Sequence, residues 1–301
     1  MGSIVPPSAC TGSEFYKIKV GTKHLKMSIY ETESIVNIYI GGPKLYCIHA
    51  TINKEDSRLV QMGFLKLAIG TIEQIYYNKQ CSLEHNFTQG IDTNMIIILL
   101  CQYVRDKYPY VTHLKFNDAS HRSCENGTEV SLMVMTFLYS GMTWYQKNFH
   151  AIIVPDEMGR YNKIVKKYDD EKKKYSWDAF NEIFIKGSLP LSEEKMKTLY
   201  DNAKTWMDFF KPLMEEIKIA EFCNFISPWL PKFINSILKD NFLIIPYMFI
   251  LDKLRPVEYT MTKYIEGGSH LGETQGQTPL RGGGKRNFTK KRERRAPRNL
   301  M

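Results

Sequence analysis

The segment "FLYSGMTWYQKNFHAII" at 137–153 places an aromatic, amide-rich turn between an expected helix and an expected strand. Tyr145 stands where that helix would end. Its side chain has two interpretations: the ring packs in the core together with Trp144, or the hydroxyl supplies a proton beside a reaction centre. Packing is the commoner role of an aromatic pair at a helix end, so the elements upstream must decide between the two.

A second group of reactive side chains lies in "HLKFNDASHRSC", at 113–124. His121 and Cys124 have a spacing that suits zinc, and Asp118 would complete three ligands. No matching second pair follows nearby, so we favour a polar turn between a strand and a helix and predict no metal site. Cys124 with His150 would form a nucleophile and its base, but nothing distinctive surrounds either residue.

Residues 14–83 are rich in Ile, Val and Tyr, in short runs that turn-forming residues separate. We expect strands at "FYKIKV", "LKMSIYE", "SIVNIYIG" and "KLYCIHATI". A longer strand is predicted at 64–78, "FLKLAIGTIEQIYYN", with a bulge or bend at Gly70.

A helix is expected at 91–109, because Asp92 or Thr93 can cap its start and Pro109 prevents its continuation. Its apolar centre implies burial against a sheet. We expect a strand at 111–118 and then a helix at 129–149 with an irregularity at Gly141. A closing strand is expected at 151–154.

The resulting order of elements over 64–154 resembles the conserved half of the GNAT-type N-acetyltransferase superfamily, over roughly a third of the chain. In that family, helix N-terminal amides hold the pyrophosphate of CoA, and a later helix ends in a pattern like Tyr-x-Lys-x-Gly-Phe. Here "WYQKNF" supplies Tyr145, Lys147 and Phe149 without the glycine. Sequences of the type "GxTWYxKxF" also look like uncharacterised proteins of large DNA viruses.

The resemblance implies that an acyl group passes from acetyl-CoA or another acyl-CoA to an amine. Tyr145 would then protonate the departing sulfur, Glu73 would act as the base, and Asn117 would orient pantetheine or substrate. The cofactor would lie on the loop and helix start at Thr88, Gln89, Gly90, Ile91 and Thr93. Taken singly, Glu73 is also explained as a solvated strand residue and Asn117 as a turn former.

Asp92 departs from the family pattern, because it replaces the second small residue of the phosphate loop. A carboxylate there repels the two phosphates unless it is turned away as a helix cap. This departure favours a GNAT-like fold that has lost catalysis over an active enzyme.

Beyond about residue 155 the chain consists of charge-dense segments and amphipathic helices. Ser192 is expected to cap a helix that continues to 217, with an apolar stripe formed by Met196, Leu199, Tyr200, Ala203, Trp206, Met207 and Phe210. We therefore predict an α+β fold. A GNAT-like mixed sheet with flanking helices would occupy 10–155, a smaller, mainly helical domain 156–264, and a disordered Gly-rich basic tail 265–301.

The net charge of +9 belongs almost entirely to the last 21 residues. Between 281 and 301 there is one acidic residue, Glu293, and nine basic ones: Arg281, Lys285, Arg286, Lys290, Lys291, Arg292, Arg294, Arg295 and Arg298. This segment carries +8, and the rest of the chain, with 32 basic and 31 acidic residues, carries +1. Such a cluster predicts salt-sensitive binding to RNA or DNA through 281–298, although a solubilising extension is the simpler alternative.

No run reaches the ~18 apolar residues that a membrane span needs, so no membrane partner is expected. The start "MGSIVPPSAC" lacks the features of a signal peptide. Six cysteines are scattered without a CxxC pair. We therefore expect reduced thiols in an intracellular protein, nuclear or cytoplasmic.

Three functions follow from these patterns. The first is an acetyltransferase-like protein, with its activity retained or lost. The second is a non-enzymatic GNAT-like scaffold whose tail contacts nucleic acid. The third is an unrelated α+β protein, such as a virus-encoded structural or replication-associated factor. The order of elements favours the first two over the third.

Overall fold

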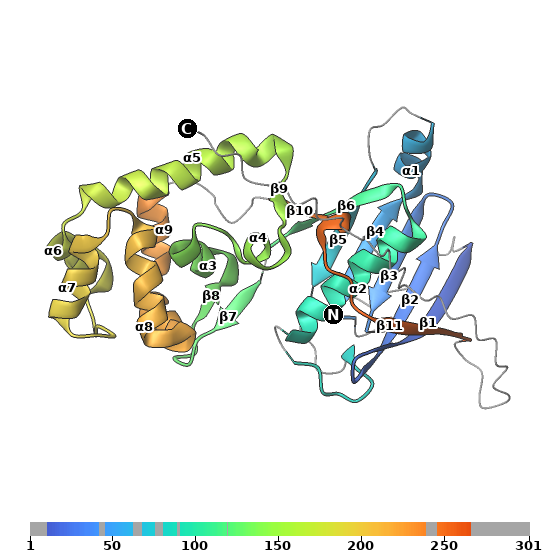
Figure 1. Cartoon of the computed structure of the whole chain (residues 1–301), viewed down its shortest axis with the longest axis horizontal. Helices are drawn as coiled ribbons and strands as arrows, with labels where there is room; N and C mark the ends of the chain where they lie inside the picture. Colours follow the sequence, from blue (N-terminus) through green and yellow to red (C-terminus); the bar gives the residue numbers. More distant parts are fainter. Residues whose placement is uncertain are drawn as a thin grey trace, which may run out of the picture.

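The structure is a computed structural model that describes residues 11–41, 46–62, 68–75, 81–88, 91–118, 120–238 and 246–265. It confirms an α+β protein with a large mixed sheet and flanking helices. In Figure 1 the sheet occupies one side of the molecule and a group of helices the other. The basic segment 281–298 lies outside the described residues.

Four antiparallel strands open the fold and confirm the expected strands of the first 53 residues. They are β1 (Gly12–Val20), β2 (Lys23–Glu31), β3 (Ile35–Ile40) and β4 (Ile48–Asn53). Apolar residues alternate with polar ones along each strand, so one face of the sheet is apolar. A short helix, α1 (Lys54–Gln61), follows β4.

A strand–helix–strand unit continues the sheet. β5 (Ala68–Ile75) pairs antiparallel with β4 and parallel with β6 (Val111–Asn117), and α2 (Ile91–Lys107) connects β5 to β6. The predicted helix at 91–109 and strand at 111–118 are thus confirmed. A Cβ atom at Gly70 would lie 2.6 Å from Leu114 Cδ2, so the close approach of β6 requires glycine there.

The predicted helix at 129–149 is two helices preceded by a strand. A hairpin of β7 (His121–Ser123) and β8 (Glu129–Ser131) leads into α3 (Leu132–Ser140), which is followed by α4 (Trp144–Phe149) and β9 (Ile152–Ile153). Gly141 ends α3 in the left-handed conformation, with φ of 65°, and its N–H donates to the Phe137 carbonyl. The irregularity expected at Gly141 is therefore a complete helix end.

The helical part begins with α5 (Pro155–Glu171), the long helix along the top of Figure 1. The others are α6 (Trp177–Phe180), α7 (Glu193–Asn202), α8 (Trp206–Ile226) and α9 (Leu230–Ile237). The single helix expected at 192–217 is divided, because Ala203 is extended and Thr205 caps α8 through its hydroxyl. The rings of Phe180 on α6, Trp206 on α8 and Phe233 on α9 pack with centroids 4.9–6.2 Å apart and hold these three helices together.

After α9 the chain returns to the sheet. β10 (Pro246–Ile250) pairs with β6 and β9, and β11 (Tyr259–Tyr264) pairs with β1 at the far edge. The strand order is β11-β1-β2-β3-β4-β5-β6-β10-β9. β10 and β11 are therefore hydrogen-bonded into the sheet, although both lie within 156–264, where the sequence predicted a mainly helical domain.

Four of the six cysteines form disulfides, so the expectation of reduced thiols is wrong for them. Cys47 is bonded to Cys81, and Cys124 to Cys223, while Cys101 is free and buried. The partners are 34 and 99 residues apart in the chain, and the Cα separations of 5.9 and 5.5 Å are ordinary for disulfides. Such long separations leave no local pattern in the sequence.

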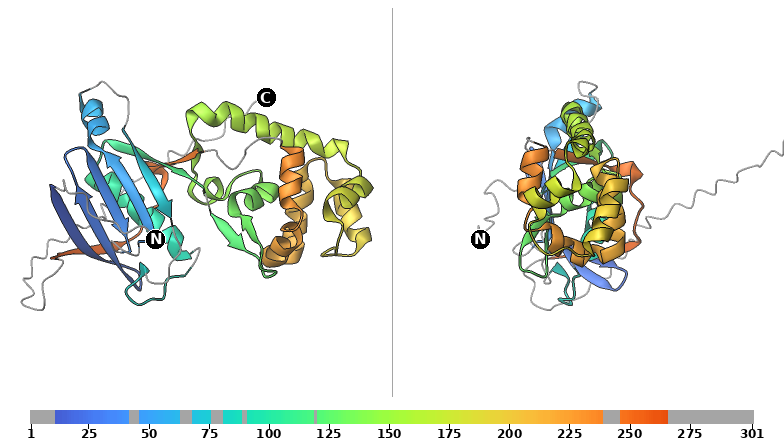
Figure 2. Two further views of the ribbon diagram at one scale, coloured as in Figure 1. Left: turned by 180° about the vertical axis from the view of Figure 1, so that it is seen from behind. Right: turned by 90° about the vertical axis from the view of Figure 1, so that its left-hand side faces the viewer.

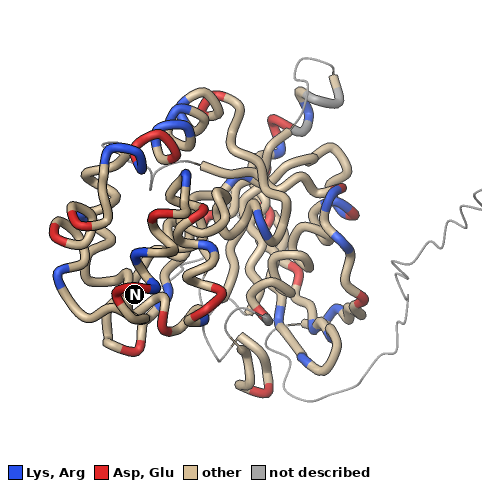
Figure 3. Tube along the Cα trace, turned by 60° about the vertical axis from the view of Figure 1, so that its left-hand side comes forward, with Lys and Arg blue, Asp and Glu red and all other residues tan. Residues whose placement is uncertain are grey.

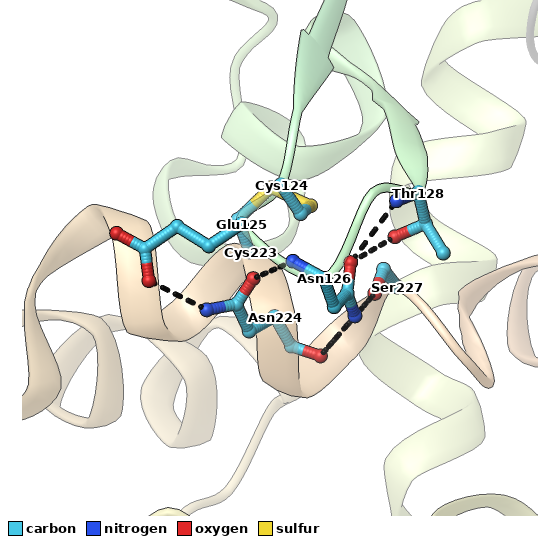
Figure 4. Close-up of a disulfide and its surroundings, with 7 residues drawn as sticks. All are labelled: Cys124, Glu125, Asn126, Thr128, Cys223, Asn224 and Ser227. Carbon is cyan, nitrogen blue, oxygen red and sulfur yellow. Dashed lines mark hydrogen bonds between the residues drawn. A yellow bond between two sulfur atoms is a disulfide. The ribbon is translucent and has the colours of Figure 1, made fainter.

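Hydrogen bonds around the second disulfide attach the β7–β8 turn to α8 (Figure 4). Asn126 donates its backbone N–H to Asn224 Oδ1 over 3.2 Å and its side-chain Nδ2 to Ser227 Oγ over 2.9 Å. Asn224 Nδ2 donates in turn to Glu125 Oε2 over 3.2 Å. The hairpin before α3 is thus fixed to the helical part both covalently and by polar contacts.

We predict that the Cys124→Ser/Cys223→Ser variant loses about 4 kcal/mol of unfolding free energy, because a cross-link over 99 residues restricts the unfolded chain strongly. Denaturant unfolding without reductant would measure the loss. Alkylation of the unreduced, denatured wild-type protein, followed by mass spectrometry, should label Cys101 and none of the four bonded cysteines. Labelling at Cys124 and Cys223 would contradict the pairing.

Candidate functional site

Tyr145, the predicted general acid, is part of an aromatic cluster. Its ring lies 4.6 Å from that of Phe116 and 5.8 Å from that of Phe249, and only 4% of the residue is exposed. Trp144 and Phe149 complete the cluster. Burial, with a smaller contribution from the charge of Asp118, raises the pKa of Tyr145 well above its ordinary value. These contacts agree with the packing interpretation of "WYQKNF".

The structure does not bring the other two predicted catalytic residues to Tyr145. Phe116, which contacts Tyr145, and Asn117 are consecutive residues of β6, so their side chains lie on opposite faces of the sheet. Glu73 is exposed on β5, beside the irregularity in its pairing with β4. No described contact of Tyr145 involves Glu73 or Asn117.

The N-terminal turn of α2, where the pyrophosphate was expected, is occupied by a carboxylate of the chain itself. Thr88 N–H, one of the predicted cofactor donors, donates to Asp92 Oδ2 over 2.5 Å. The same oxygen lies 3.2 Å from Lys23 Nζ, and the Asp92 side chain is only 7% exposed. Lys23 also donates to the Asn86 backbone and side-chain oxygens. Asp92 thus supplies the negative charge that the helix dipole favours.

The loop before α2 is packed down on the sheet. Phe87 is 2% exposed, and Ile91 begins the helix. Thr93 lies in the first turn, with a buried hydroxyl that has no hydrogen-bond partner among the described residues. Gln89 and Gly90 lie outside the described residues.

The parallel strands on either side of this loop stay paired. The first residue pair of β5 and β6 is Ala68 with Val111, and the last is Ile72 with Phe116, the penultimate residue of β6. Glu73, Gln74 and Ile75, the last three residues of β5, have no partner on β6.

Asp118 is a buried carboxyl whose charge acts on Tyr145, and the sequence analysis considered it only as a zinc ligand. Its Oδ1 accepts from the Ser120 N–H over 2.9 Å, whereas Oδ2 is buried without a partner among the described residues. Burial raises the pKa of Asp118. Cys124 is bonded to Cys223 and therefore is not available as a ligand or a nucleophile, and the described residues contain no cluster of three metal-binding side chains.

No family model matches the chain, and neither a curated protein nor a solved structure is significantly similar to it. The described helices include none that is long and apolar enough to cross a membrane.

We predict that Asp92→Ala lowers the free energy of unfolding by about 2 kcal/mol, because the Thr88 N–H loses its acceptor and Lys23 loses its ion-pair partner. Asp92→Asn keeps an oxygen for Thr88 and should cost about half as much. Asp106→Ala, at the exposed end of the same helix, is the matched control and should change stability little. Equal effects of Asp92→Ala and Asp106→Ala in denaturant unfolding would contradict the structural role of Asp92.

Proposed function

We propose that this protein is a non-enzymatic, nucleic-acid-associated protein whose basic segment 281–298 binds the phosphates of RNA or DNA. The observation that carries the proposal is the location of charge: +8 of the net +9 lies between 281 and 301. Lys and Arg side chains bind phosphate backbones largely by releasing condensed counterions, so such a cluster supplies affinity without sequence preference.

Residues 1–280 carry almost no net charge. Acidic and basic side chains are interspersed on the helices in Figure 3. On α5, for example, Lys163 and Lys166 are followed by Asp169, Asp170 and Glu171. Mixed charges of this kind cancel beyond about 10 Å at ordinary ionic strength. The tail is therefore the stronger candidate for the first encounter with a polyanion.

The contacts at α2 support a non-catalytic protein over an acyltransferase. Asp92 uses Thr88 N–H, which the family resemblance assigned to the pyrophosphate. Tyr145 is 4% exposed and packed among aromatic rings, so a thiolate has no described path to its hydroxyl. The strand–helix–strand unit would then serve as a scaffold that carries the tail.

We predict that calorimetric titration with acetyl-CoA gives no binding heat at millimolar cofactor. The reason is that Asp92 would repel the two phosphates at the helix start. Asp92→Asn is the informative variant, since it removes this charge and keeps the hydrogen bond to Thr88. Saturable heat with wild-type protein would revive the acyltransferase interpretation.

We predict that the full chain binds a DNA duplex with strong salt dependence, and that deletion of 266–301 abolishes this binding. A control variant with the residues of 281–298 in scrambled order keeps the charge and should bind equally well, because counterion release does not depend on sequence. Fluorescence anisotropy between about 50 and 200 mM salt would measure both. Unchanged binding by the deletion variant would refute the role of the tail.

A further inference from the structure

The nine-stranded sheet has two unlike faces. α2 packs against the apolar face, which includes Leu25, Ile38 and Leu114. The described helices leave the opposite face of β1–β4 uncovered, and Figure 2, left, views the sheet from that side, with α2 behind it. We call this the open face. By strand alternation and register, this face carries Phe15, Lys17 and Lys19 of β1. It also carries the residues that pair with them on the neighbouring strands.

Aromatic rings cross the open face from the edge strand to the centre. Tyr264 of β11 lies 6.0 Å from Phe15 of β1, and Phe15 lies 5.9 Å from Tyr30 of β2. Tyr30 is 5.8 Å from Tyr39 of β3, which stacks on His49 of β4 at 4.2 Å with an angle of 8° between the rings. Tyr39 is buried, whereas the other four residues are half-buried and keep part of their surface exposed. The rings therefore form a continuous ladder over five strands.

The charged side chains of the open face are mainly cationic. Lys17, Lys19 and Lys115 are exposed there, and Lys26 is half-buried. The open-face positions of β11, β1, β2, β3, β4 and β6 contain no Asp or Glu in the described strands. The exposed carboxylate of Glu73 stands at the irregularity of β5. The carboxylate of Glu84 contacts the Nδ1 atom of His24, an open-face residue of β2. The strand positions of this face are thus more basic than the helices, where both signs are mixed.

Neutral hydrogen-bonding groups lie beside the rings on β3, β4 and β5. Asn37 Oδ1 is 3.1 Å from His49 Nε2 and accepts from Thr51 Oγ1 over 3.4 Å. Tyr46 donates its hydroxyl to Gln74 Oε1. Burial lowers the pKa of His49 to about 4, so the imidazole is neutral near pH 7. Amides, hydroxyls and a neutral imidazole suit the polar edges of a nucleobase, which carry no charge.

We propose that the open face binds single-stranded nucleic acid, with bases stacked on the ladder of rings and phosphates held by Lys17, Lys19 and Lys115. Base stacking on aromatic side chains together with a basic groove is the general means by which proteins hold single strands. In one RNA-binding module, a four-stranded sheet stacks about two or three bases on its aromatic side chains. A ladder that spans five strands has room for a similar number.

As in the proposed function, the partner of the open face is nucleic acid. The open face, however, binds unpaired bases by stacking, which the basic tail does not do. The tail binds any phosphate backbone, single-stranded or duplex. Stacking requires unpaired bases, which a duplex hides in its interior. The open face therefore predicts a preference for single strands over duplexes, whereas the tail alone, through counterion release, favours the more densely charged duplex.

The test compares a fluorescent 12-nucleotide single strand with the 12-base-pair duplex, both bound to the full-length protein. We expect the single strand to bind about tenfold more tightly. Phe15→Leu/Tyr30→Leu keeps the apolar contacts of these rings and removes their flat π surfaces, and it should abolish that tenfold preference. Duplex binding, which belongs to the tail, should stay unchanged.

The charge requirement is tested with Lys17→Gln/Lys19→Gln/Lys115→Gln. We expect this variant to reduce the slope of log K against log salt for the single strand by about 2, since each phosphate contact contributes about 0.7. Lys163→Gln/Lys166→Gln/Lys197→Gln removes three equally exposed cations from α5 and α7 and should leave the slope unchanged. Equal effects of the two triple variants would overturn the proposal.

Photocrosslinking of a halouracil-substituted single strand to the wild-type protein locates the contact directly. Crosslinks to Phe15 or Tyr30 support the open face, and crosslinks confined to 266–301 refute it while leaving the proposed function intact. If the full chain binds neither single strand nor duplex, both proposals fail. A dimer in light scattering that the open-face variants dissociate would assign this face to a second copy of the chain instead.

Discussion

The parallel pairing of β5 with β6 is the contact on which the rest of the sheet depends. It joins the antiparallel strands β11 and β1–β4 to the group β6, β10 and β9, and no other strand pair connects these two groups in the described sheet. Because parallel neighbours need a crossover connection, α2 must lie over one face. Gly70 makes the pairing close, since any side chain there would collide with Leu114.

This pairing also accounts for the character of the candidate site. The last pair of β5 and β6 is Ile72 with Phe116, near the end of β6. The ion pair of Lys23 and Asp92 then fixes the loop before α2 from the side of β2. Together, these contacts tie the N-terminal turn of α2 and the loop before it to β2.

The helical part and the sheet are joined by several connections that are distant in sequence. The disulfide of Cys124 and Cys223, with the hydrogen bonds of Asn126, attaches the β7–β8 turn to α8. β10 returns from the helices to pair with β6, so the end of the helical part is hydrogen-bonded into the sheet. Since α2 covers one face, the aromatic and basic side chains of the opposite face are not covered by the described helices.

The sequence by itself determined the local elements and the location of charge. Runs rich in Ile, Val and Tyr between turn-forming residues identified β1–β4, and the residues from Asp92 to Pro109 indicated the extent of α2, because strand propensity and helix capping depend on neighbouring residues. Only the tertiary structure decided which residues that are distant along the chain come into contact. The partners of Cys47 and Cys124, the return of β10 and β11, and the burial of Tyr145 have no local signature. The open face likewise exists only because five separate strands place Tyr264, Phe15, Tyr30, Tyr39 and His49 side by side.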